Sequence, residues 1–310
     1  MTRSMAISKP VLTAVVLAVG VSAGQVGAVL AAPTSGKIVA VGAENEYSNV
    51  IAQVGGSYVK VASILSNPNT DPHSFEASPA VAELVGAADL VVQNGLGYDS
   101  FMNKIEAASP NQMRHVIDVR RLLGLPASTA NPHLWYKPTT MPAVAKAVAA
   151  VLGKLAPSHA TYFRARAQTF DASLTPWYHA IAQLKERFPH VPVAVTEPVG
   201  DYLLQAVGAK NRTPWTLQAD IMNGVDPAPQ AVSFQDGLFS HHKVEVFLYN
   251  QQVTDSLTDS FLALAKQRGI PVVGLYETMP SPGYDYQSWM MAETKALNRA
   301  LADKKSTVRL

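Results

Sequence analysis

Two histidines of this chain lie in turns that would prepare them to bind a metal ion. His73 and His133 each follow an Asx-Pro pair, in the tripeptides DPH and NPH. Proline fixes its own φ and pushes the residue before it towards extended geometry, so an imidazole on such a turn loses little freedom on binding. In the alternative interpretation, both histidines only hydrogen-bond to the backbone of their turns.

Two glutamates occupy matching places in the second half of the chain. Glu197 directly follows the apolar segment VPVAVT, and Glu277 directly follows IPVVGLY. A carboxylate at the end of a buried strand is poorly solvated unless a helix N-terminus, an arginine or a cation is its partner. Helix capping stays open for Glu197, because a proline and then a predicted helix follow it. Together, two imidazoles and two carboxylates suit a divalent transition metal.

The elements that must position these residues alternate between strand-like and helix-like patterns. This alternation predicts an α/β fold of two doubly wound lobes joined by a long helix, with Pro176 kinking or splitting that helix. The predicted lobes are residues 33–156 and 191–310, and the connecting helix is 157–190. Residues 210–236 are polar and allow no assignment. The predicted strands are 38–43, 58–65, 89–93, 115–119, 191–196, 244–249 and 270–276, and the main predicted helices are 45–54, 78–88, 99–108, 142–155, 199–207, 255–268 and 286–302.

Cysteine is absent from all 310 residues. Its absence excludes disulfides, thiolate nucleophiles, cysteine-ligated zinc and a lipid-modified N-terminal cysteine. A metal site must therefore use histidine, carboxylates, backbone carbonyls or water.

The first 32 residues have the pattern of a cleaved secretory signal peptide. Arg3 and Lys9 precede a short apolar stretch, and small residues lead to a cleavage site near Ala31 or Ala32. A membrane anchor is the alternative, but the most apolar part is shorter than the roughly 20 residues that a spanning helix needs. Removing this segment leaves 23 basic and 23 acidic residues, so we expect no nucleic-acid surface. The mature protein is expected to be soluble, exported and free of a lipid anchor.

Several ordered segments resemble one known family. The segments QVGG, DPHSFEASP, ADLVVQNGLGYD, NPHLW, TEPVGDYLLQAVG and ETMPSPGYDYQSWM resemble the zinc- or manganese-specific solute-binding proteins of bacterial ABC importers, of the cluster A-I type. The resemblance covers essentially the whole mature chain. It implies one metal in a cleft between two lobes, with His73, His133, Glu197 and Glu277 as ligands.

Two departures from the family pattern bear on the identity of the metal. The fourth ligand is commonly aspartate and here is Glu277, and the histidine-rich loop of zinc-specific members is absent, since only His115 lies between the two candidate histidines. Glutamate as third ligand favours manganese by resemblance, whereas the general affinity order favours zinc. We expect manganese or zinc, with iron(II) as a further candidate.

The sequence therefore predicts a non-enzymatic periplasmic receptor that captures a divalent metal and delivers it to a membrane permease. We expect a monomer with small lobe movements. The alternative is a mononuclear metallohydrolase or oxygenase that uses two histidines and a carboxylate. Catalytic metals keep an open position, so a fourth ligand at Glu277 favours binding. A secondary adhesin role also stays open.

Other conspicuous residues are expected to have different roles. His241 and His242 would be solvated residues at the entry to a strand, on opposite faces. His159 and His179 would lie on the connecting helix, and Glu76 could orient His73. The large aromatic residues near the motifs are expected to fill the core: Trp135, Tyr286 and Trp289.

Overall fold

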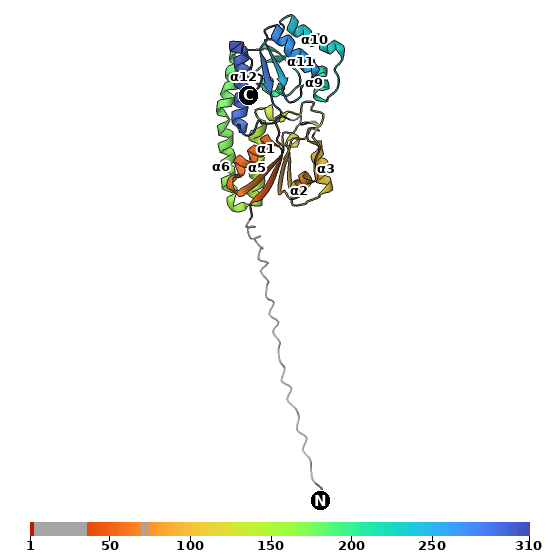
Figure 1. Ribbon diagram of the computed structural model, residues 1–310. Coiled ribbons are helices and arrows are strands. Elements are labelled where there is room, and N and C mark those ends of the chain that lie inside the picture. The colour runs from red at the N-terminus through yellow and green to blue at the C-terminus, as the bar shows by residue number, and fades with distance from the viewer. Residues whose placement is uncertain (3–35, 70–71, 73–74) are drawn as a thin grey trace. The chain divides into compact units, whose positions relative to one another are not determined.

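The computed structural model describes residues 1–2, 36–69, 72 and 75–310 (Figure 1). The predicted signal peptide beyond its first two residues, and the candidate ligand His73, lie outside the described residues. Residues Gly36–Leu310 form one compact unit. Within the described part of the chain, no helix has both the length and the apolar character needed to cross a bilayer.

The first half of the compact unit is built on a parallel four-stranded sheet. Its strand order is β2-β1-β3-β4, with β1 in contact with both β2 and β3. Apolar residues on both faces of β1 and β3 are buried, as is usual for parallel sheets covered by helices. The elements are β1 (Ile38–Glu44), α1 (Asn45–Gly55), β2 (Val59–Leu65), α2 (Pro79–Gly86), β3 (Leu90–Gln93), α3 (Ser100–Ala108), β4 (His115–Asp118), α4 (Val119–Leu122) and α5 (Thr140–Leu155).

The second half repeats this topology. Its sheet has the order β6-β5-β7-β8, again fully parallel. The segment 210–236, which the sequence left unassigned, contains a two-residue edge strand and two helices. The elements are β5 (Pro192–Val195), α8 (Asp201–Ala206), β6 (Lys210–Asn211), α9 (Trp215–Met222), α10 (Pro229–Ser240), β7 (Val246–Asn250), α11 (Ser256–Gln267), β8 (Val272–Leu275) and α12 (Tyr286–Asp303).

Two consecutive helices connect the halves, α6 (Ala160–Ser173) and α7 (Thr175–Arg187). The break falls at Leu174, and Pro176 stands in the first turn of α7, where its missing N–H leaves no helical bond unmade. The predicted split at Pro176 is therefore confirmed. Helix α6 packs on α1 and α5, whereas α7 packs on α12 (Figure 1).

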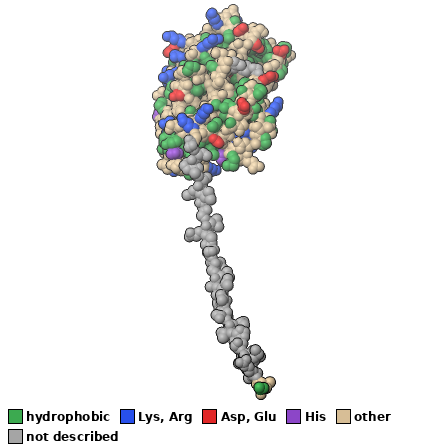
Figure 2. Space-filling model, turned by 60° about the horizontal axis from the view of Figure 1, so that its bottom comes forward, with side chains coloured by type: hydrophobic (Ala, Val, Ile, Leu, Met, Phe, Trp, Pro, Cys, Tyr) green, Lys and Arg blue, Asp and Glu red, His purple; other side chains and the backbone are tan. Residues whose placement is uncertain are grey.

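The predicted fold class, two parallel α/β lobes joined by a helical connection, is confirmed. The domain boundaries at 156/157 and 190/191 stay a prediction, because one large apolar cluster extends through both sheets. Trp135, Tyr286 and Trp289 are fully buried in it, as expected. On the face shown in Figure 2, lysine and arginine side chains are interspersed with acidic ones.

One local prediction was wrong. His241 and His242 do not lie on a strand. They occupy an exposed turn after α10, where the His241 N–H bonds to the Gly237 carbonyl. Helix α10 extends to Ser240 and β7 begins only at Val246, so the turn lies between them. Exposure of both side chains agrees with the expectation that they are solvated.

Candidate metal centre

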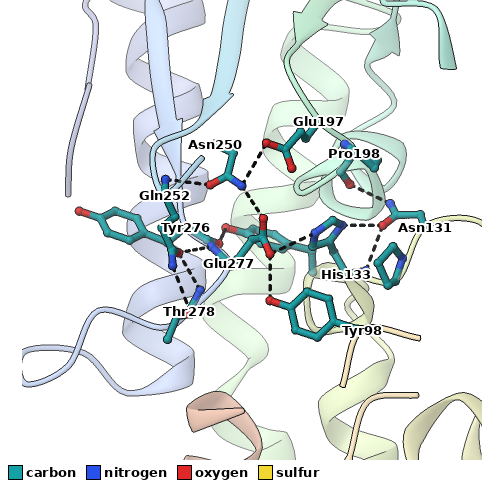
Figure 3. A network of polar contacts seen from close by, with 12 residues as sticks. Tyr98, Asn131, His133, Glu197, Pro198, Asn250, Gln252, Tyr276, Glu277 and Thr278 are labelled. Carbon is teal, nitrogen blue, oxygen red and sulfur yellow. Dashed lines mark hydrogen bonds and ion pairs between the residues drawn. The ribbon is translucent and has the colours of Figure 1, made fainter. Parts of the chain in front are cut away.

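His133 and Glu277 meet in the interior of the compact unit (Figure 3). His133 Nε2 lies 3.6 Å from Glu277 Oε2, and both side chains are fully buried. The Tyr98 hydroxyl donates to the same Glu277 oxygen at 2.9 Å. Two residues from different halves of the chain thus bring a nitrogen and a carboxylate oxygen together, as the sequence predicted for this pair.

The NPH turn fixes the orientation of the His133 ring. The side-chain oxygen of Asn131 accepts the His133 backbone N–H at 3.0 Å and lies 2.8 Å from Nδ1 of the same histidine. Since an amide oxygen can only accept, Nδ1 carries a proton, and the ring is held with Nε2 facing Glu277. Asn131 also donates to the Pro198 carbonyl at 2.8 Å. The asparagine therefore orients one candidate ligand and anchors its loop beside another, Glu197.

Asn250 holds the two candidate glutamates near each other. Its amide nitrogen donates to Glu277 Oε1 and also to Glu197 Oε1, the latter at 3.3 Å (Figure 3). Asn250 ends β7, Glu197 follows β5 and Glu277 follows β8. Parallel strands end at the same edge of a sheet, and ligands of such sheets collect at that edge. The site therefore uses three neighbouring strand ends of the second sheet.

The Glu277 loop has further support from Gln252. The side-chain oxygen of Gln252 accepts the backbone N–H groups of Glu277 at 2.6 Å and of Thr278 at 2.8 Å. Its backbone N–H donates in turn to the Asn250 side chain at 3.0 Å. The polar chain from Asn250 to Gln252 thus fixes both the backbone and the carboxylate of Glu277.

The supporting residues Tyr98, Asn250 and Gln252 were missed in the sequence. A signal existed for Asn250, because it directly follows the apolar segment VFLY in the same way that the two glutamates follow theirs. Glu197 contacts Asn250, while α8 begins at Asp201 with Gly200 as its N-cap and no side-chain capping bond. Glu197 therefore does not cap α8; its contact is with Asn250.

The predicted ligand set is brought together in part. His133 and Glu277 are in direct contact, and Glu197 reaches the pair through Asn250. Within the described residues, no group of three or more His, Asp or Glu side chains is arranged to hold a metal. Because His73 lies outside these residues, convergence of all four ligands stays a prediction.

The remaining candidates lie elsewhere. Glu76 is exposed, as is His179 on α7. His159 is partly buried and stacks on Tyr58 with ring centroids 3.9 Å apart. Both histidines lie in the predicted connecting segment, one in a packing contact and one on the surface.

Two buried carboxyl groups of the first lobe, Glu44 and Glu46, hold their protons well above the usual pH. Burial raises the pKa of Glu46 to about 8, with the charge of Glu277 among the smaller causes. Burial, together with the charges of Asp99 and Glu46, also raises the pKa of Glu44 well above its ordinary value. Among the described residues, the carboxyl oxygens of Glu44 and Glu46 have no hydrogen-bond partner. The attraction between a cation and an ionised carboxylate is stronger in such an interior than in water.

Comparison with curated proteins finds metal-binding relatives. Iron-binding protein YfeA of Yersinia pestis is 22% identical over 216 residues, covering 66% of this chain and 67% of YfeA. Manganese-binding lipoprotein MntA of Bacillus subtilis is 28% identical over 138 residues, covering 42% of this chain and only 44% of MntA.

Solved structures share the fold. Periplasmic zinc-binding protein TroA from Treponema pallidum superposes with a TM-score of 0.73 at 18% identity, covering 86% of this chain and 100% of that one. The Mn-bound periplasmic metal-binding protein from Candidatus Liberibacter asiaticus gives a TM-score of 0.67 at 17% identity, with the same coverage.

Residues 41–300 match the family model of ZnuA, described as zinc-uptake complex component A, periplasmic. This family consists of non-enzymatic solute-binding proteins that bind metal ions and work with ABC-transporter permeases, so the metalloenzyme alternative is not favoured. The match spans most of the chain and both sheets, and the chain therefore belongs to the ZnuA family.

Proposed function

We propose that this protein captures a divalent transition metal in the periplasm and delivers it to the permease of an ABC importer. The observation that carries the proposal is the buried pair of His133 and Glu277, contributed by the two halves of the chain. Asn250 brings Glu197 to the same place. Such a pair suits a cation better than a neutral solute, because the cation neutralises carboxylates that are costly to bury.

The proposed ligands are His73, His133, Glu197 and Glu277. Asn131 orients the His133 ring, and Tyr98 and Asn250 hold the Glu277 carboxylate in place. Loading would proceed without large lobe movements, because hydrogen bonds already cross between the lobes beside the ligands. Tyr202 donates to the Asn131 carbonyl at 3.0 Å, and Asn131 donates back to Pro198.

We propose manganese as the preferred cargo, with zinc as the main competitor. Two glutamates supply up to four hard oxygen donors, which manganese accepts readily, whereas zinc binds most mixed nitrogen and oxygen sites more tightly. The relatives carry different metals in their names, iron for YfeA and manganese for MntA, which supports a divalent transition metal without selecting one.

The experiment is a calorimetric titration of metal-free protein, residues 33–310, with Mn²⁺ and Zn²⁺. The expected result is one ion per chain, with binding lost in His133→Ala and in Glu277→Ala. His179→Ala is the matched control, because His179 is exposed on α7. Unchanged binding in both site variants would refute the proposed centre.

Export, cleavage near Ala31 or Ala32, the lack of a lipid anchor and a monomeric state remain predictions. N-terminal sequencing and mass determination of the periplasmic protein check the first three. Sedimentation analysis checks the last.

A further inference from the structure

Glu293 on α12 is a fully buried carboxyl group that lies outside the metal centre. The Trp289 indole N–H donates to its Oε1 at 3.1 Å, and the Tyr136 hydroxyl oxygen lies 3.4 Å from the same atom. Its Oε2 has no hydrogen-bond partner among the described residues, and none of their basic side chains pairs with it. A buried carboxylate in such surroundings would be very costly.

Counting hydrogens shows which group donates. The Tyr136 hydroxyl has one hydrogen, and the Tyr276 carbonyl oxygen lies only 2.8 Å away, so the hydroxyl donates there. At 3.4 Å from the Tyr136 oxygen, a protonated Glu293 can donate its hydrogen to that oxygen, whereas an ionised Glu293 would compete with the Tyr276 carbonyl for the hydroxyl hydrogen. Burial raises the pKa of Glu293 to about 8, which agrees with a protonated acid at neutral pH. The resulting chain runs from Trp289 through Glu293 and Tyr136 to the Tyr276 carbonyl.

This series of hydrogen bonds ends beside two candidate ligands. Tyr136 stands three residues after His133, and Tyr276 directly precedes Glu277. The Tyr136 hydroxyl therefore connects the NPH loop of one half to the strand end that bears Glu277 in the other. A change in the direction of this hydroxyl would alter how firmly the two ligand-bearing segments are held together.

We propose that Glu293 is a positioning residue for the metal centre: as a neutral donor to Tyr136, it keeps the Tyr136 hydroxyl on the Tyr276 carbonyl and so holds Glu277 opposite His133. The inference rests on the proposed function, because it assumes that these two residues bind the metal. Glu293 touches neither of them directly, so its effect passes through Tyr136 and through the backbone of Tyr276.

Ionisation of Glu293 would reverse the hydrogen bond between Glu293 and Tyr136. A carboxylate is a stronger acceptor than a carbonyl, so Tyr136 would turn to Glu293 and release Tyr276. The titratable groups next to Glu293 are Tyr136 and Tyr276. The charge of Glu277 contributes to raising the pKa of Tyr136, and the charge of Arg309 acts to lower the pKa of Tyr276. Helix α7 contacts α12 through the neutral pair Trp177 and Thr294, next to Glu293 in sequence, and through Arg187, which donates to Asn298.

The test compares Mn²⁺ affinity of the wild type and Glu293→Gln between pH 7 and pH 9. Glutamine cannot ionise, so the ratio of the two dissociation constants isolates Glu293 from other groups that titrate in this range. We expect the Mn²⁺ affinity of the wild type to fall about tenfold relative to that of Glu293→Gln between pH 7 and pH 9. This factor corresponds to the loss of one hydrogen bond. A ratio that stays constant would overturn the inference. His179→Ala should follow the wild type.

Two further measurements cover other outcomes. Tyr136→Phe removes the hydroxyl, so it should already bind Mn²⁺ more weakly at pH 7 and show no added loss by pH 9, even if Glu293→Gln fails to fold. In metal-free protein, tryptophan fluorescence should titrate near pH 8 through Trp289, and this transition should be absent in Glu293→Gln. Absence of binding of both Mn²⁺ and Zn²⁺ by the wild type would contradict the proposed function, whereas the fluorescence transition would still test the ionisation of Glu293.

Discussion

Glu46 should make the metal-free protein less stable as the pH rises. It lies in the first turn of α1, fully buried, with neither carboxyl oxygen hydrogen-bonded among the described residues. Burial raises its pKa from 4.5 to about 8. Between these values the unfolded chain is ionised while the folded chain still holds the proton. Stability is therefore full below pH 4.5 and is lost progressively as the pH rises towards 8.

The size of the effect follows from the same two values. At pH 7 the unfolded carboxyl is about 2.5 pH units above its pKa, and at 1.36 kcal/mol per unit this gives about 3 kcal/mol. Glu46→Gln cannot ionise in either state, so it should raise the free energy of unfolding by up to about 3 kcal/mol at pH 7 and by almost nothing at pH 4. The figure is an upper bound, because the glutamine amide is also buried without a partner.

Urea unfolding of metal-free protein at pH 4, 5.5 and 7 measures the difference. Glu186→Gln on the exposed surface of α7 is the matched control and should give no comparable gain at any pH. An equal gain at all three pH values would mean that the benefit is not electrostatic. An unchanged free energy of unfolding of Glu46→Gln at pH 7 would refute the conclusion that burial raises the pKa of Glu46 and thereby destabilises the fold.

Two other substitutions probe the supports of the site and the fold. Gln252→Leu removes the acceptor for the Glu277 and Thr278 backbone N–H groups. The Mn²⁺ affinity measured by calorimetry should therefore fall about tenfold, while the stoichiometry is kept. An unchanged affinity would show that other contacts hold the loop. Gly274→Ala would place a Cβ 2.0 Å from the Val308 carbonyl oxygen, so the C-terminal segment must move away from β8 and thermal unfolding should show a loss of about 1–3 kcal/mol with Mn²⁺ stoichiometry unchanged. An unaltered midpoint would mean that the segment adjusts without cost.

The strands and most helices could be predicted because their sequence signals are local. Short apolar runs bounded by turns became the parallel strands. The rule of looking for polar residues directly after such runs singled out Glu197 and Glu277, which both contact Asn250 in the fold. The same rule applied to Asn250 would have found the residue that joins them. It was overlooked because an amide carries no charge that needs a partner.

Other features depend on contacts that the sequence does not display locally. Helices α9 and α10 begin after Pro214 and Ala228, and neither has a side-chain cap to mark its start. The Tyr98 contact with Glu277 and the Tyr136 contact with Glu293 join residues far apart in the chain. Such pairings follow from packing the two lobes together, and only the fold reveals them.

The buried acids give the protein a reason to be less stable empty than loaded. Glu46 and Glu277 are close enough for each charge to raise the cost of the other, and Glu44 adds to that cost. Replacing them with apolar residues would favour folding, but it would also remove carboxyl groups that can ionise beside a bound cation and stabilise it. A ligand that binds only the folded chain adds stability in proportion to its affinity, so a bound metal would offset the penalty that these carboxyl groups impose.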